Sequence, residues 1–233
     1  MRTKNTKRTR SATGRAVRAL STNTNGDGSG SRPKRIRDRA AKKEALILAA
    51  LELFASKGYE VTTTREIAAV AGCAEGLIHR YFKGKAGLLT ELMEYRVSRE
   101  ELDLTRPLQP APRLEDEFLQ LVDREVERVW ENRDFLRVFI PRAIVDPSVG
   151  RIMNKALISA RVKAISERLK RYESCATLPQ DATGALAQAV GMLGLVFGFV
   201  RPVLLGQDRL RARKMATTVA RVFVGSSANS LLV

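Results

Sequence analysis

The stretch from Thr62 to Leu89, TTTREIAAVAGCAEGLIHRYFKGKAGLL, constrains the fold more than any other part of this 233-residue chain. It has the pattern of two short helices joined by a tight turn. Thr63 can cap the first helix while Glu66, three residues later, hydrogen-bonds back to the capping residue. Gly72 can take the left-handed conformation that ends this helix without steric cost. We expect the second helix to begin near Glu75.

Apolar residues recur along one side of both helices at helical spacing. Three positions also carry the residue types that a DNA-binding helix-turn-helix requires. Ala68 is small enough for the helices to cross, Gly72 forms the turn, and Ile78 fills the corner between them. The side chains that we expect to be buried are Ile67, Val70, Ala71, Ile78 and Phe82.

The same region carries a wider set of spaced residues, from about Arg37 to Leu89. They are Phe54-Ala55-Ser56-Lys57-Gly58-Tyr59, Thr62-Thr63, Ile67-Ala68, Ala71-Gly72, Gly76, Tyr81-Phe82 and Lys85. This set resembles the N-terminal domain of the TetR family of bacterial transcriptional regulators, over roughly a quarter of the chain. Four residues depart from the usual family pattern, so the DNA sequence recognised does not follow from the resemblance: Ala74, Leu77, His79 and Gly84.

The second helix of a helix-turn-helix lies in the major groove, where each base pair presents its own donors and acceptors. With Ile78 and Phe82 pointing inward, the opposite face carries Gly76, His79, Arg80 and Lys83, with Glu75 and Leu77 at its edges. Gly76 permits a close approach of the backbone. Arg80 can contact guanine, Leu77 a thymine methyl group, and Glu75 a cytosine amino group. The alternatives are that Arg80 and Lys83 are solvated charges and that Glu75 only favours the helix N-terminus.

Other residues of this region suit the phosphate backbone. Lys85 begins the next helix, where an ammonium group and free amides favour an anion. Thr63 and Thr64 lie at another helix start and can act in the same way. We expect Tyr81 to pack, with its hydroxyl at the DNA backbone, while His79 is either a phosphate donor or a surface residue.

Charge is strongly uneven along the chain. Residues 1–36 hold ten Lys or Arg and one Asp, a net +9 of the total +16. This segment lacks apolar periodicity and contains NTNGDGSGS, so we interpret it as a disordered basic arm. A phosphate-binding arm is the first interpretation; a solubilising tail or start-site artefact and an organellar transit peptide are the alternatives.

The rest of the chain reads as helix. We expect the first helix from about Asp38 to Lys57, a helix-turn-helix domain over 37–104 and a Pro-rich linker over 105–112. Residues 113–233 then form a helical bundle, interrupted by a loop at 174–179. The predicted fold is all-α with about nine helices: a three-helix helix-turn-helix DNA-binding domain followed by a C-terminal helical domain.

The resemblance implies that the C-terminal domain dimerises and holds a small-molecule effector. One pattern in the sequence supports close helix packing there, against a dimer mate or a neighbouring helix, with space for a ligand as the alternative: Gly184, Ala187, Gly191, Gly194 and Gly198. Our candidate dimer anchors are Val190, Leu193, Phe197, Val219, Val222 and Phe223. Residues that would suit either an apolar pocket or an ordinary core are Phe118, Trp130, Phe135, Phe139 and Met153. Residues that would suit an anionic group or the surface are Arg142, Arg161 and Arg201.

The sequence does not have the residue patterns of several other classes of protein. Cys73, Cys175 and the single His79 form neither a disulfide framework nor a metal site, and no cofactor is indicated. No catalytic set is present. The uncharged run from Gly184 to Val200 is shorter than a membrane span. We therefore expect a cytoplasmic, dimeric repressor that binds an inverted repeat in double-stranded DNA and is released by an effector; the alternative is a largely non-specific architectural DNA-binding protein driven by its basic arm.

Overall fold

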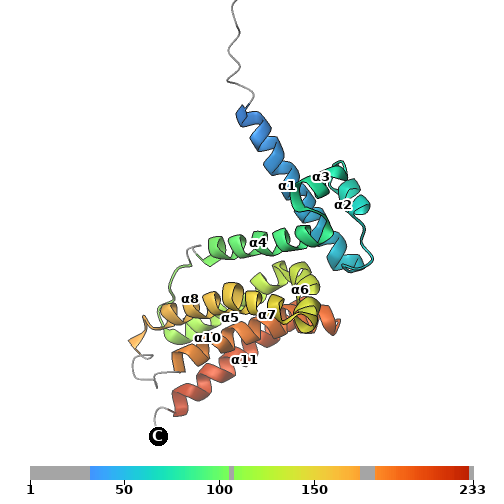
Figure 1. Cartoon of the computed structure of the whole chain (residues 1–233). Helices are drawn as coiled ribbons and strands as arrows, with labels where there is room; N and C mark the ends of the chain where they lie inside the picture. The colour runs from blue at the N-terminus through green and yellow to red at the C-terminus, as the bar shows by residue number, and fades with distance from the viewer. Residues whose placement is uncertain (1–31, 105–107, 174–181, 231–233) are drawn as a thin grey trace, which may run out of the picture. The chain divides into compact units, whose positions relative to one another are not determined.

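The computed structural model describes residues 32–104, 108–173 and 182–230 (Figure 1). Most of the expected basic arm, the start of the expected linker and the expected loop with Cys175 lie outside these ranges. The chain divides into two compact units, Met1–Asp38 and Arg39–Val233. All contacts reported below lie within the second unit.

Four helices precede the linker, and we refer to them as the front helices. They are α1 (Arg32–Lys57), α2 (Thr64–Val70), α3 (Gly76–Phe82) and α4 (Lys85–Leu104). Helix α1 begins six residues before the expected start at Asp38, and Pro33 is compatible with its first turn. Gly58, with φ of +93°, ends α1 as expected.

The remaining helices follow the linker, and we call them the rear helices. They are α5 (Leu114–Glu131), α6 (Arg133–Val145), α7 (Pro147–Met153), the π-helical η1 (Asn154–Ser159), α8 (Ala160–Leu169), α10 (Ala182–Leu195), the π-helical η2 (Val196–Leu204) and α11 (Arg209–Ser230). Because α7, η1 and α8 are continuous, as are α10 and η2, the described residues form nine helical segments without a strand. The predicted all-α fold is confirmed.

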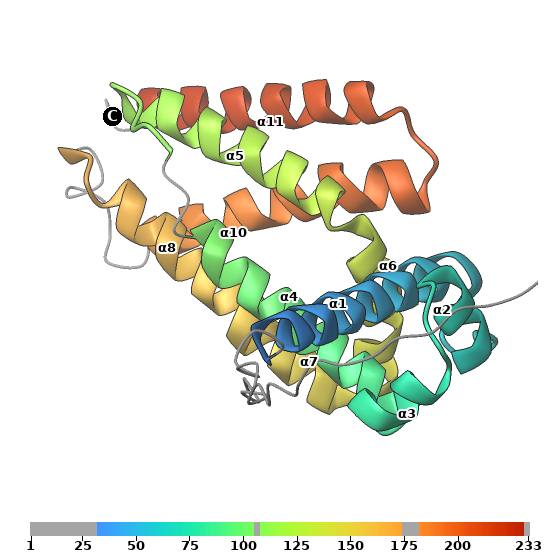
Figure 2. The same ribbon diagram turned by 90° about the horizontal axis from the view of Figure 1, so that it is seen from above.

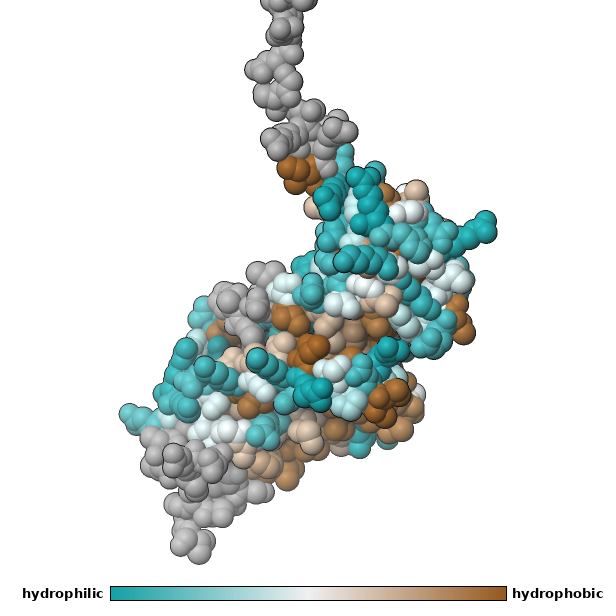
Figure 3. Space-filling view, viewed as in Figure 1, coloured by the Kyte–Doolittle hydropathy of each residue, from teal (hydrophilic) through white to brown (hydrophobic). Residues whose placement is uncertain are grey.

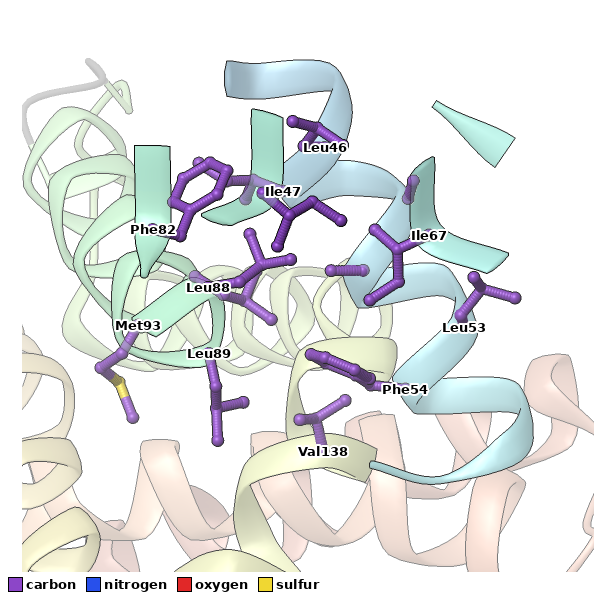
Figure 4. Packing of buried hydrophobic residues seen from close by; sticks show 14 of the residues in the cluster. Leu46, Ile47, Leu53, Phe54, Ile67, Phe82, Leu88, Leu89, Met93 and Val138 are labelled. Carbon is purple, nitrogen blue, oxygen red and sulfur yellow. The ribbon is translucent and has the colours of Figure 1, made fainter. Parts of the chain in front are cut away.

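Buried apolar side chains form two clusters. The first lies among the front helices and includes Ile67, Ile78, Phe82 and Leu88 (Figure 4). Rear helix α6 completes it, and Val138 lies beside Phe54 in the same figure. The second cluster lies among α5, α8, α10 and α11. Helix α6 therefore belongs to the core of the front helices, although α5 separates it from them in sequence.

Helix α5 lies beside both α10 and α11 (Figure 2). A Cβ atom on Gly194 would lie 2.8 Å from the Cβ of Glu125, and one on Gly198 would lie 2.5 Å from the carbonyl oxygen of Val126. These glycines therefore serve close packing against a neighbouring helix of the same chain. Gly184 and Gly191 have no such neighbour within 4 Å.

The candidate dimer anchors need correction. Val190 and Phe197 are buried in the second cluster, so they are not available to a partner. The helical run Ala182–Leu204 is long and apolar enough to cross a membrane, the one such helix among the described residues. Its buried side chains, including Val190 and Phe197, pack inside this chain, as in the core helix of a bundle.

The aromatic residues considered for a pocket do not gather in one place. Phe135 and Phe139 stack at 4.3 Å between ring centres in the first cluster, and Met153 packs against that cluster. Phe118 belongs to the second cluster. Trp130 lies against the guanidinium groups of two arginines. The other four residues are divided between two cores.

A buried ion network joins α4, α5 and α8. The carboxylate of Glu125, 1% exposed, accepts hydrogen bonds from Arg161 at 2.7 Å and from Arg128 at 2.9 and 2.8 Å. Arg128 also reaches Glu100 on α4 at 3.2 Å, and Arg96 lies 2.6 Å from the same Glu100 oxygen. Burial alone would raise the pKa of Glu125, but the adjacent Arg128 and Arg161 outweigh it and hold that pKa below its usual value.

Candidate nucleic-acid interface

The start of α2 is fixed by the expected capping box. The Thr63 hydroxyl accepts a hydrogen bond from the Glu66 amide at 3.2 Å, and the Thr63 amide donates to the Glu66 carboxylate at 2.9 Å. Lys57 binds the other carboxylate oxygen at 2.7 Å. The bond from Lys57, followed by those from Thr63, lowers the pKa of Glu66 to about 2.

The turn between α2 and α3 also follows the expected pattern. Gly72 has φ of +61°, and the amide of Cys73 donates to the Ala68 carbonyl at 2.9 Å. Ile67 and Ala68 are buried, whereas Val70 is 52% exposed, so its expected burial is wrong. Two helical positions separate Val70 from Ala68, about 200° around the axis, and this turns its side chain away from the core.

Helix α3 exposes the predicted face. Ile78 and Phe82 are 0% and 4% exposed, and they anchor α3 in the first cluster. On the opposite side an exposed strip remains, which we call the recognition face: Gly76, His79, Arg80 and Lys83. Figure 3 shows mainly hydrophilic side chains over the front helices, and more hydrophobic ones over the rear helices. Among the described residues, the polar side of α3 is therefore exposed.

The residues of the recognition face differ in backbone geometry. An added Cβ on Gly76 would meet nothing within 4 Å, so the backbone there is open to close approach. Lys83 has a left-handed conformation with φ of 62° and ends α3. The Lys83 side chain consequently projects from the end of α3, whereas those of His79 and Arg80 project from within the helix.

The two edge residues of α3 and Tyr81 are held by neighbours. The Thr64 hydroxyl donates to the Glu75 carboxylate at 2.6 Å, which ties the start of α2 to the start of α3. Leu77 is half-buried against the first cluster. Tyr81 is half-buried, edge-on to Phe82, with the Arg39 guanidinium 5.3 Å from its ring centre. Base or phosphate contacts by these residues remain predictions.

Lys85 has partners within the chain. Its ammonium group donates to the carbonyl oxygens of Tyr59, Glu60 and Thr62 at 2.9, 3.1 and 3.1 Å. It also lies 4.5 Å from the centre of the Tyr59 ring. These carbonyls come from a loop some 25 residues earlier in sequence, so no local pattern could indicate them.

Gly87 is a residue that sequence reasoning missed. A Cβ atom there would lie 1.7 Å from the carbonyl oxygen of Phe82, the last residue of α3. A side chain cannot be accommodated without moving the end of α3 away from α4. The close approach of these two helices, which fixes the tilt of the recognition face, therefore depends on glycine at this position.

The three arginines considered for an anionic ligand all have partners in the chain. Arg161 binds Glu125 and Asp103 in the buried network. Arg142 lies against Tyr59 and Glu60, and Arg201 donates to Gln207 at 3.2 Å.

The described part of the chain is thus all-helical, with a helix-turn-helix whose second helix exposes a polar, basic face. Residues 46–92 match the family model for bacterial regulatory proteins of the tetR family. Over these residues the chain is similar to the TetR family of transcriptional regulators.

Curated relatives from Bacillus subtilis include two proteins named as HTH-type transcriptional regulators. The uncharacterized regulator YerO is 41% identical over 56 residues, which cover 24% of this chain and 19% of YerO. The probable regulator YttP is 27% identical over 146 residues, covering 60% of this chain and 70% of YttP. The alignment with YerO thus spans about a fifth of that relative.

Solved structures match over most of the chain. A putative fatty acid metabolism regulator from Clostridium perfringens has a TM-score of 0.58 at 20% identity, covering 76% of this chain and 96% of its own. A putative regulator from Saccharomonospora viridis, solved in complex with choline, has a TM-score of 0.61 at 18% identity, covering 76% and 93%. At these identities the likeness shows the fold, including the rear helices.

Proposed function

We propose that this protein is a dimeric, sequence-specific repressor that binds an inverted repeat in double-stranded DNA. The observation that supports this most is the exposure of His79, Arg80 and Lys83 opposite the buried anchors of α3. Such a helix presents donors to the edges of bases in the major groove. Arg80 reads guanine, Gly76 permits close approach, and the α2 start with Thr63 and Thr64 faces the phosphates.

Dimerisation follows from how such a helix reads DNA. One recognition helix covers few base pairs, whereas two related by a two-fold axis cover a palindrome. Large apolar side chains remain exposed on α10 and α11, at Met192, Met215, Val219 and Val222. We infer that these last helices form the interface, in place of the buried Val190 and Phe197.

A small-molecule effector is the third part of the proposal. The structural neighbours include a regulator solved in complex with choline, and this chain shares its rear-helix fold. An effector releases DNA only if it binds the non-binding conformation more tightly, because equal affinity for both conformations shifts nothing. We place the protein in the cytoplasm, where operator DNA and such ligands meet.

A basic arm of net +9 favours a second candidate, a non-specific architectural DNA-binding protein. Removal of residues 1–36 separates the two functions. Binding of a selected duplex and a random duplex is measured by fluorescence anisotropy at several salt concentrations. A repressor keeps its preference for the selected duplex after truncation, whereas an architectural protein loses most of its affinity and shows no preference before it.

A further inference from the structure

Cations hold the loop between α1 and α2, residues 58–63, from two sides. Lys85 at the start of α4 binds three of its carbonyls, and Arg142 on rear helix α6 lies 5.0 Å from the Tyr59 ring centre. We propose that Lys85 and Arg142 are positioning residues that clamp this loop, so that α6 sets the position of α2. This inference rests on the proposed DNA-binding function.

The ammonium group of Lys85 has no donor left for DNA. A lysine has three N–H donors, and the three carbonyls of Tyr59, Glu60 and Thr62 lie at 2.9 to 3.1 Å from Nζ. A phosphate could bind only by displacing one of these carbonyls, which would then lose its partner. Lys85 therefore holds the protein together at this point and is not a phosphate ligand.

The clamped loop leads directly into the DNA-facing helices. The hydroxyl of Thr62, 1% exposed, donates to the Gly58 carbonyl at 2.7 Å and closes the loop on itself. The next residue, Thr63, caps α2, and Thr64 binds Glu75 at the start of α3. A shift of the loop is therefore passed to the starts of both helices.

The Tyr59 ring lies within reach of both cations, since Lys85 Nζ lies 4.5 Å and the Arg142 guanidinium 5.0 Å from its centre. Arg142 also lies 3.4 Å from the carboxylate of Glu60. Pro141 precedes Arg142 and removes one backbone donor inside α6.

The salt dependence of DNA binding tests the role of Lys85. The full chain, Lys85→Met, Arg142→Met and the control Arg137→Met are titrated with a duplex selected from random sequence. Arg137 is exposed on the same helix, and within the described part of the chain its one ion-pair partner is Asp134 of that helix. We expect affinity losses of about 2- to 30-fold for the first two variants, none for the control, and an unchanged salt slope. A slope reduced by about 0.9 for Lys85→Met would show a phosphate contact and overturn the proposal.

A double-mutant cycle tests whether the two cations act together. Because both hold one loop, the loss in the Lys85→Met/Arg142→Met variant should be smaller than the product of the single losses. Independent, multiplicative losses would contradict the clamp. If Lys85→Met does not fold, Tyr59→Leu takes its place in the cycle with the same expected result, since it removes the shared ring and keeps the carbonyls bound.

Amide hydrogen exchange tests the clamp without DNA. In Arg142→Met, protection should fall over residues 58–70, while Arg137→Met retains it and circular dichroism shows unchanged helix content. Unchanged protection would overturn the clamp even if DNA binding weakened. If the unaltered chain bound no duplex at all, the proposed function would fail, and this measurement would still decide the inference.

Discussion

Arg80 is the side chain on which base recognition most depends. Its exposed position on α3 allows a bidentate contact with guanine. We expect Arg80→Ala to cost about 1–3 kcal/mol on the preferred duplex and to relax selection at one base pair. Anisotropy titrations on preferred and random duplexes measure this, with Arg137→Ala as the control. Equal losses on both duplexes would mean that Arg80 contacts only phosphate.

Glu66 provides a test of the α2 start by pH. Its pKa, lowered to about 2, lies below the ordinary value of 4.5. Its contribution to stability is therefore fully present above pH 4.5 and is lost as the pH falls toward 2. Carboxyl NMR titration should give a midpoint near 2, and Lys57→Gln should raise it. A midpoint near 4.5 in the unaltered chain would show that the capping box is open.

Two glycines of helix α10 allow the effect of close packing on stability to be distinguished from the effect of helix propensity. Gly194→Ala should destabilise the fold by about 1–3 kcal/mol, because its Cβ would lie 2.8 Å from that of Glu125. Gly191→Ala, on the same helix but facing open space, should stabilise it by up to about 1 kcal/mol. Urea denaturation of both variants measures the difference. A similar change in both variants would show that α10 does not approach α5 so closely.

The elements differed in how well sequence predicted them. The capping box of Thr63 and the turn at Gly72 were predictable because their partners lie within a few residues. The prediction that Val70 is buried was wrong because a helix of seven residues has too few positions for periodicity to show which side faces the core. The partners of Lys85 and the burial of Phe197 depend on residues distant in sequence, so only the folded chain reveals them.

At the scale of the whole molecule, the buried ion network links the linker-proximal end of α4 to α5 and α8. Glu125→Ala would remove one carboxylate partner from each of Arg128 and Arg161, which would keep Glu100 and Asp103, respectively, so we expect a loss of about 3–5 kcal/mol in unfolding free energy. Glu167→Ala, which removes an exposed pair with Lys170, is the control and should change little. Chemical denaturation measures both, and equal small effects would show that the network is solvated.

The same network makes the free energy of unfolding depend on pH. Because the pKa of Glu125 is lower in the folded chain than its usual value, the contribution of Glu125 to the free energy of unfolding is present above the usual pKa and falls as the pH drops below it.

Rear helix α6 completes the front core with Val138 and reaches Tyr59 with Arg142. The front and rear helices are thus joined by a core, a network and a clamp.

In the proposed function, the α3 helices of two subunits related by a two-fold axis read the bases. Selection of bound sequences from a random duplex library, at near-physiological salt, tests it most directly. We expect enrichment of an inverted repeat whose half-sites lie about one helical turn apart, with a guanine preference that Arg80→Ala removes. Recovery of sequences without a shared motif would contradict it.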